Sequence, residues 1–201
     1  MLILRSSPAS PFGRKVKIAA KITGTYDRFR IEPANTMGPG DTLRQQNPLG
    51  KLPALILEDN TVLYDSRVIC EHLDSLHVGP SIFPDGAARW PALTLQALAD
   101  GIMDAGLLLV YEKRYRPEEF WHAPWMEMQQ EKVDRALAAL EGAPPALPKS
   151  PHIGHIALAC ALGYLDFRFA GRWRDTNTDL TGWLEAFENS VPAFAETAPR
   201  D

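Results

Sequence analysis

Short apolar runs and helix-like spacing of apolar positions alternate along the first part of the chain. Residues 2–5 form an apolar run bounded by Ser6-Ser7-Pro8, and apolar positions then recur near helical spacing over residues 16–22. Phe29 and Ile31 alternate with charged residues, which predicts a half-exposed second strand. The connection between these two strands contains a whole helix, and a crossover of this length makes the two strands parallel.

A hairpin and a further helix are predicted next. Residues 54–57 and 61–64 are rich in β-formers and flank Glu58-Asp59-Asn60, a turn signal that predicts an antiparallel hairpin. Asp65 or Ser66 is the N-cap of the helix that follows. Because the polar stretch before the hairpin has room for only a short helix, the predicted order through residue 76 is β-α-β-α-β-β-α.

The pattern changes at residues 79–86, which are rich in proline and glycine. We interpret them as a linker between a first domain, residues 1–78, and a second domain, residues 87–201. The second domain is predicted to be all helical, since nothing in it demands a strand. Its helical segments are residues 90–115, 123–140, 153–169 and 181–189.

Composition and charge exclude several function classes. The net charge of -4 and the lack of a long basic run argue against a nucleic-acid partner. Cys70 and Cys160 suit packed, reduced thiols in the cytosol better than a disulfide. No apolar stretch approaches ~18 residues, and the N-terminal run is typical of a strand, so we expect neither export nor membrane insertion.

Three motifs carry the candidate chemistry. Ser10-Pro11-Phe12-Gly13-Arg14-Lys15-Val16 opens the first helix, Asn47-Pro48-Leu49-Gly50-Lys51-Leu52-Pro53 enters the third strand, and Asp65-Ser66 begins a later helix. In this order and spacing they resemble the cytosolic glutathione transferase family of bacterial type, over essentially the whole chain. The resemblance implies a thioredoxin-like domain followed by a helical domain. It also implies a cytoplasmic, detoxifying homodimer that uses glutathione as cosubstrate, with no other cofactor and no metal.

Each part of glutathione has candidate partners. Its γ-glutamyl carboxylate suits the start of the third helix, where free N–H groups and the dipole favour an anion and Ser66 can donate a further hydrogen bond. Asp65 would hold the ammonium group. The cysteinyl backbone can pair with Leu52, provided that the Leu52-Pro53 bond is cis, as the resemblance implies. Lys51 and, ranked below it, Asn47 are candidates for the glycyl carboxylate or for shaping its loop.

The glutathione thiol needs a group that stabilises its thiolate, because a thiol with a pKa of about 8.5 is largely protonated at neutral pH. The resemblance implies a Tyr after the first strand, or a Ser or Cys at the first helix. The first Tyr and the first Cys are Tyr26 and Cys70, both past that point. Ser10 remains as the catalytic candidate, with Ser7 and then Ser6 as rivals. A plain N-cap role for Ser10 is compatible with this one, since a hydroxyl both accepts and donates.

For a small apolar electrophile, the resemblance implies a pocket where the helical domain faces Ser10. Tyr111 and Arg114 lie three positions apart on one helical face. The further candidates are Met103, Leu107, Tyr115 and, from the first domain, Phe12. A glutathione-dependent isomerase or dehalogenase would use the same thiolate, and a non-catalytic binding or regulatory protein would keep the same fold.

One departure from the family pattern lies at the core helix of the second domain. The family usually has a Ser/Thr-x-x-Asp capping box there, and this chain has His152 and His155. Neither side chain replaces a hydroxyl or a carboxylate well, so we expect Ser150 and Pro151 to begin the helix two residues earlier. A metal pair is a weak alternative, because no third ligand is near.

Overall fold

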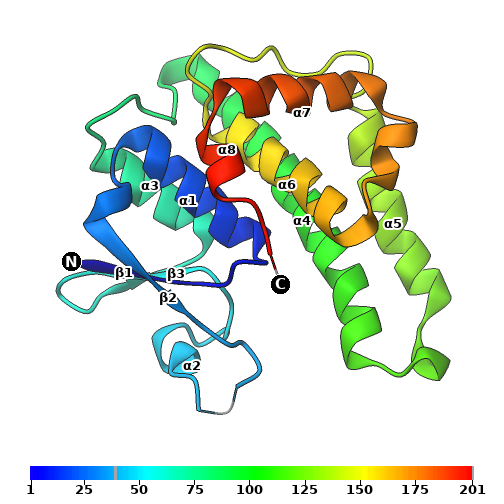
Figure 1. The fold of residues 1–201 in the computed structure, drawn as a ribbon, viewed down its shortest axis with the longest axis horizontal. Helices are drawn as coiled ribbons and strands as arrows, with labels where there is room; N and C mark the ends of the chain where they lie inside the picture. The colour runs from blue at the N-terminus through cyan, green and yellow to red at the C-terminus, as the bar shows by residue number, and fades with distance from the viewer. Residues whose placement is uncertain (39, 201) are drawn as a thin grey trace. The chain divides into compact units, whose positions relative to one another are not determined.

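A computed structural model describes residues 1–38 and 40–200 (Figure 1). The chain divides into two compact units. The first unit is Met1–Arg89 together with the C-terminal segment from Pro192, and the second is Trp90–Val191. The predicted boundaries differ from these units: residues 1–78 form the predicted first domain, and the C-terminal segment belongs to the predicted helical domain, residues 87–201.

The first unit contains a mixed four-stranded sheet in the order β2-β1-β3-β4. β1 and β2 are parallel and β3 and β4 are antiparallel, so both predicted pairings are confirmed. β1 also pairs antiparallel with β3. The strands are β1 (Leu2–Ser6), β2 (Phe29–Pro33), β3 (Ala54–Ile56) and β4 (Val62–Leu63). The helices are α1 (Pro11–Thr23), α2 (Leu43–Gln46), α3 (Ser66–Ser75) and α8 (Ala193–Glu196). Up to α3 this is the predicted thioredoxin-like order.

Apolar side chains are more deeply buried on the central strands β1 and β3 than on the edge strand β2. Leu4 on β1 pairs with Leu55 on β3, and both are fully buried. Phe29 on β2 is buried, but Ile31 on the same strand is 40% exposed. β2 is an edge strand, so its second apolar side chain is only partly covered.

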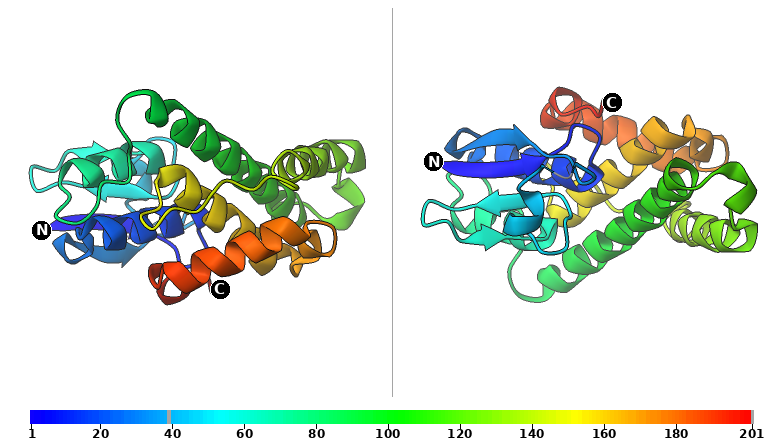
Figure 2. Two further views of the ribbon diagram at one scale, coloured as in Figure 1. Left: turned by 90° about the horizontal axis from the view of Figure 1, so that it is seen from above. Right: turned by 90° about the horizontal axis from the view of Figure 1, so that it is seen from below.

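The C-terminal segment belongs to the first unit because it packs on α1, and both Figures 1 and 2 show α8 in red beside α1 in blue. Arg14 donates from Nη2 to the backbone oxygen of Phe194 at 2.7 Å, and its guanidinium lies 3.8 Å from the centre of the Phe194 ring. Lys21 forms an ion pair with Glu196 at 2.7 Å. Hydrophobic periodicity does not reveal these contacts, since the partners are far apart in sequence.

The second unit is helical, as predicted. Its main helices are α4 (Arg89–Tyr115), α5 (Ala123–Ala138), α6 (Ile153–Phe169) and α7 (Thr178–Ser190). α6 is the central core helix, since every residue from Ile153 to Leu165 is buried. In the described part of the chain, the helical stretch Gly86–Tyr115 is long and apolar enough to cross a membrane by length and composition alone. Core helices of soluble proteins pass the same test, and Met103 and Ile102 on α4 are buried within the protein.

The start of α6 corrects one prediction. The helix begins at Ile153 with His152 as its N-cap, so the expected cap by Ser150 and Pro151 is wrong. His152 Nδ1 accepts from the backbone N–H of Gly154 at 3.1 Å, and His155 Nδ1 accepts from the backbone N–H of His152 at 3.1 Å. Two stacked imidazole rings, with 3.6 Å between their centroids, therefore form a reciprocal capping box. They take the place of the Ser/Thr and Asp of the usual family pattern.

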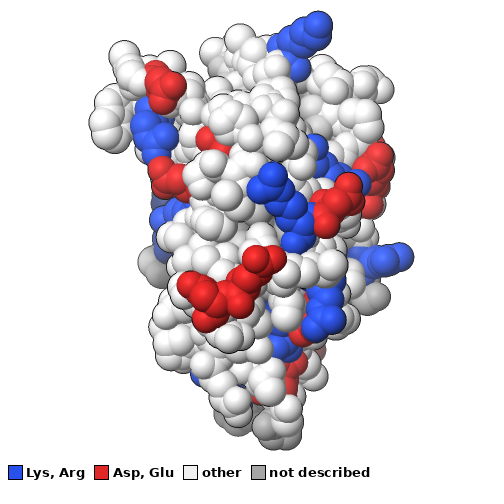
Figure 3. Space-filling view, turned by 90° about the vertical axis from the view of Figure 1, so that its left-hand side faces the viewer, with Lys and Arg blue, Asp and Glu red and all other residues white. Residues whose placement is uncertain are grey.

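Charge on the surface is mixed. On the face drawn in Figure 3, basic and acidic side chains are interspersed among uncharged ones. On that face no basic side chains gather into a continuous stripe.

Candidate functional site

The sheet brings the candidate motifs of the first unit to one edge. β3 and β4 pair with Leu55 opposite Leu63, and Pro53 and Asp65 each lie two residues beyond this pair, at the same end of the hairpin. β1 and β3 pair with Arg5 opposite Ala54, so the end of β1 reaches the same edge. The loop before β3, the start of α3 and the end of β1 therefore lie at the same end of the sheet, although they are far apart in sequence.

Asn47 shapes the loop before β3. It is buried, its Oδ1 accepts from the backbone N–H of Leu49 at 3.0 Å, and its Nδ2 donates to the backbone oxygen of Lys51 at 2.9 Å. Its own backbone oxygen accepts from the N–H of Gly50 at 2.8 Å. This geometry favours the loop-shaping alternative for Asn47. Lys51 is exposed, and the described residues offer its ammonium no partner, so it is free for a ligand carboxylate.

The Leu52-Pro53 peptide bond is cis, which confirms the condition that strand-like pairing with a peptide required. Leu52 lies just before β3 and outside the ladder between β1 and β3. Pairing within the sheet therefore does not use its backbone groups.

Asp65 caps α3, and Ser66 is the first residue of that helix. One carboxylate oxygen of Asp65, Oδ1, accepts from the backbone N–H of Arg67 at 2.9 Å, and the side chain is exposed. The Tyr64-Asp65 bond is also cis. Ser66 is buried, with 1% of its surface exposed. An anionic group at the start of α3 would meet the positive end of the helix dipole.

The three candidate serines differ in accessibility. Ser10 is the N-cap of α1, is half-buried, and accepts from the backbone N–H of Gly13 at 3.1 Å, so its hydroxyl proton is left for a ligand. Ser7 accepts in the same way from Ala9 at 3.3 Å. Ser6 is buried, and a methyl group on Gly13 would lie 2.2 Å from its Oγ, so the first turn of α1 covers it. Ser10 and Ser7 both remain candidates.

The helical unit contains a pocket of about 410 Å³ at the end of α4, lined by Leu108, Tyr111, Glu112, Tyr115, Arg116, His122 and Trp125. The Tyr111 and Tyr115 rings lie 5.0 Å apart, and burial raises the pKa of Tyr111 above its ordinary value. Leu107 and Arg114 are not among its lining residues, and Met103 is fully buried. Phe12, in the first unit, is half-buried beside the Lys15 ammonium.

Sequence reasoning missed Arg5. It is 6% exposed at the end of β1 and bonds to residues 28 to 41 positions away, which no local pattern reveals. Among the residues that the structure describes, no three His, Cys, Asp or Glu side chains gather as a metal site. His152 and His155 both use Nδ1 for backbone bonds.

Comparisons with known proteins cover both units. Residues 4–81 match the family described as "Glutathione S-transferase, N-terminal domain", and residues 123–186 match "Glutathione S-transferase, C-terminal domain". The chain is 36% identical over 202 residues, 98% of each sequence, to the "Uncharacterized GST-like protein YibF" of Escherichia coli (strain K12).

Solved structures of similar proteins contain glutathione. A glutathione transferase family member from Pseudomonas fluorescens Pf-5 with bound glutathione is 44% identical, with a TM-score of 0.90 and full coverage of both chains. A second structure described in the same words has bound S-(propanoic acid)-glutathione, with 44% identity, a TM-score of 0.88 and full coverage of both chains. A glutathione S-transferase from Methylobacillus flagellatus KT with glutathione bound is 32% identical, with a TM-score of 0.86 and full coverage of both chains.

Proposed function

The chain belongs to the glutathione S-transferase family, and we propose that it binds glutathione in its first unit and activates the thiol for attack on a small apolar electrophile. The observation that supports this proposal is the β3–β4 hairpin, which is preceded by the Pro53 loop and followed directly by Asp65 as the N-cap of α3. Relatives that are 44% and 32% identical over their full length support it, since both were solved with glutathione.

Each group at this edge has a role in the proposal. Asp65 holds the γ-glutamyl ammonium, while the N–H groups at the start of α3 and the Ser66 hydroxyl hold the carboxylate. The Leu52 backbone pairs with the cysteinyl residue, and Lys51 attracts the glycyl carboxylate. Asn47 keeps this loop in shape.

Ser10 donates a hydrogen bond to the glutathione sulfur and so favours the thiolate. The thiol proton leaves to solvent, and the sulfur forms a bond to an electrophilic carbon. In a substitution that carbon loses its leaving group with the bonding electrons; in an addition the electrons of its double bond move to the neighbouring atom, which takes up a proton from solvent. A relative bound to S-(propanoic acid)-glutathione supports such chemistry, since that ligand is substituted on sulfur. We also propose a cytoplasmic homodimer that acts in detoxification, on the strength of the family alone.

Asp65→Asn is expected to weaken glutathione binding about tenfold in Kd, measured by isothermal titration calorimetry. Asn caps a helix as well as Asp does, so the change removes the charge opposite the ammonium and keeps α3 intact. A hydrogen bond to a charged group contributes about 1.5 kcal/mol or more, and about 1.4 kcal/mol is a factor of ten in Kd.

Asp59→Asn is the matched control. Asp59 is also exposed and accepts from the N–H two residues ahead, at 2.9 Å from Thr61, but it lies in the hairpin turn between β3 and β4. This variant should bind glutathione like the native protein. If the native protein fails to bind glutathione at millimolar concentration, or if both variants lose the same affinity, the proposed site is wrong.

A further inference from the structure

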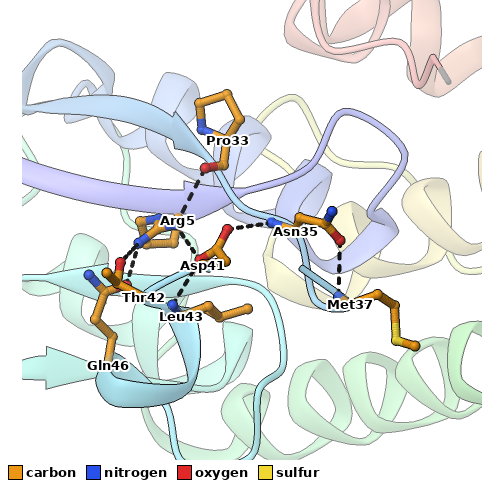
Figure 4. A network of polar contacts seen from close by, with 8 residues as sticks. All are labelled: Arg5, Pro33, Asn35, Met37, Asp41, Thr42, Leu43 and Gln46. Atoms are coloured by element: carbon orange, nitrogen blue, oxygen red, sulfur yellow. Dashed lines mark hydrogen bonds and ion pairs between the residues drawn. The ribbon is translucent and has the colours of Figure 1, made fainter. Parts of the chain in front are cut away.

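Arg5 lies at the centre of a buried polar network in the first unit (Figure 4). Its Nη1 donates to Thr42 Oγ1 at 2.9 Å and to Gln46 Oε1 at 2.5 Å. Its Nη2 donates to Asp41 Oδ1 at 2.8 Å and to the backbone oxygen of Pro33 at 3.4 Å. One side chain on β1 thus contacts the end of β2 and both ends of α2, since Thr42 is the N-cap of α2 and Gln46 is its last residue.

Asp41 extends the network along the backbone. Its Oδ1 also accepts from the N–H of Leu43 at 2.8 Å, and its Oδ2 accepts from the N–H of Asn35 at 2.7 Å. These backbone bonds, with Arg5 beside them, lower the pKa of Asp41 below its ordinary value. The ionised Asp41 carboxylate therefore binds three groups at once: the backbone of Asn35 just after β2, the backbone at the start of α2, and Arg5.

α2 depends on such contacts, since an isolated helix of four residues is not stable. Its last residue, Gln46, bonds to Arg5, and the next residue is Asn47, whose N–H donates to the Leu43 oxygen at 2.7 Å. The Asn47 side-chain amide in turn donates to the backbone oxygen of Lys51. A continuous series of bonds therefore runs from Arg5 through α2 to the loop before Pro53.

We propose that Arg5 is a positioning residue for glutathione: by holding α2 through Asp41, Thr42 and Gln46, it sets where Lys51 and Leu52 meet the peptide. This inference rests on the proposed function. The planar guanidinium is what the role requires, because it directs several donors at once, whereas a Lys ammonium is a point charge that cannot reach the same acceptors.

Arg5→Lys keeps the charge and removes the forked geometry. We expect the KM and Kd for glutathione to rise about tenfold, while kcat at saturating glutathione stays within about twofold and the pKa of the bound thiol is unchanged. Asp41→Asn should cause a shift of the same kind, and the double variant should be little worse than either single one, since both break one network. Arg30→Lys is the control, because Arg30 is an exposed arginine on β2 that pairs with Glu32.

Hydrogen exchange of the ligand-free protein gives a readout that does not depend on glutathione. Amides of residues 47–51 should exchange faster in Arg5→Lys and in Asp41→Asn than in Arg30→Lys, while those of α1 stay protected. Unchanged exchange at residues 47–51 in both network variants would overturn the inference. A fall in kcat in these variants with an unchanged KM for glutathione would also overturn it. Failure of the native protein to bind glutathione would instead contradict the proposed function, and the exchange data would still decide whether Arg5 holds the loop.

Discussion

Ser10→Ala is expected to raise the pKa of enzyme-bound glutathione by about one to two units, and to lower the rate of conjugation at pH 7 about 8-fold to 25-fold. A hydrogen bond to a charged group contributes roughly 1.5–3 kcal/mol, and one pKa unit corresponds to about 1.36 kcal/mol. A bound thiol near its free pKa of about 8.5 is only about 3% ionised at pH 7. Steady-state kinetics against a small aryl halide, together with a thiolate titration, measures both effects.

The N-cap bond between Ser10 and Gly13 complicates this variant, because its loss alone costs about 1 kcal/mol of stability. Ser10→Gly separates the two roles, since Gly at an N-cap costs only a few tenths of a kcal/mol. It should lose as much activity as Ser10→Ala. Ser7→Ala is the matched test of the rival hydroxyl, which makes a similar local bond. Loss of the rate in Ser7→Ala with none in Ser10→Ala would transfer the role to Ser7, and no loss in either would end the serine mechanism.

Acidification from pH 7.5 to 4 is expected to lower the free energy of unfolding by up to about 3 kcal/mol through His155. Burial, with His152 beside it, lowers the pKa of His155 to about 4 from an ordinary 6.5. The unfolded chain therefore takes up this proton first as the pH falls, so the stabilisation is complete above 6.5 and is lost towards 4. Burial lowers the pKa of His152 too, in the same direction. Urea unfolding at several pH values measures the loss.

The capping geometry explains why both rings must stay neutral. Each Nδ1 accepts from a backbone N–H, and a protonated ring would present a donor to that donor. The double variant His152→Ser/His155→Asp replaces the pair by the Ser-x-x-Asp box and should lose the decline between pH 6.5 and 4.5 that the native protein shows. An equally steep decline in the double variant would show that other groups cause it.

Much of the fold follows from local patterns. The apolar period predicts the end of α6 at residue 169, as observed, although the cap expected at Ser150 put its start too early; the order of elements up to α3 needs only turn and cap signals. The sheet edge that gathers Pro53 and Asp65 follows from an antiparallel hairpin with a short turn. Such features depend on residues close in sequence, so they can be predicted from local patterns in a single amino-acid sequence.

The remaining features depend on specific partners far away or on unusual chemistry. Arg5 finds its acceptors on β2 and α2, and Arg14 finds Phe194 at 180 positions' distance, so neither has a local signal. The capping box of His152 and His155 was not predicted, because an imidazole ring is an uncommon replacement for the hydroxyl or carboxylate of such a box. A neutral imidazole nitrogen is nevertheless an acceptor, and the spacing of three from His152 to His155 is that of a capping box.

The central claim is that this chain binds glutathione and stabilises its thiolate. Titration of the native protein with saturating glutathione, followed by the ultraviolet absorbance of the thiolate, tests it most directly. The account predicts a bound-thiol pKa about one to two units below the free value of about 8.5. A bound thiol that titrates at its free value would contradict activation by this site.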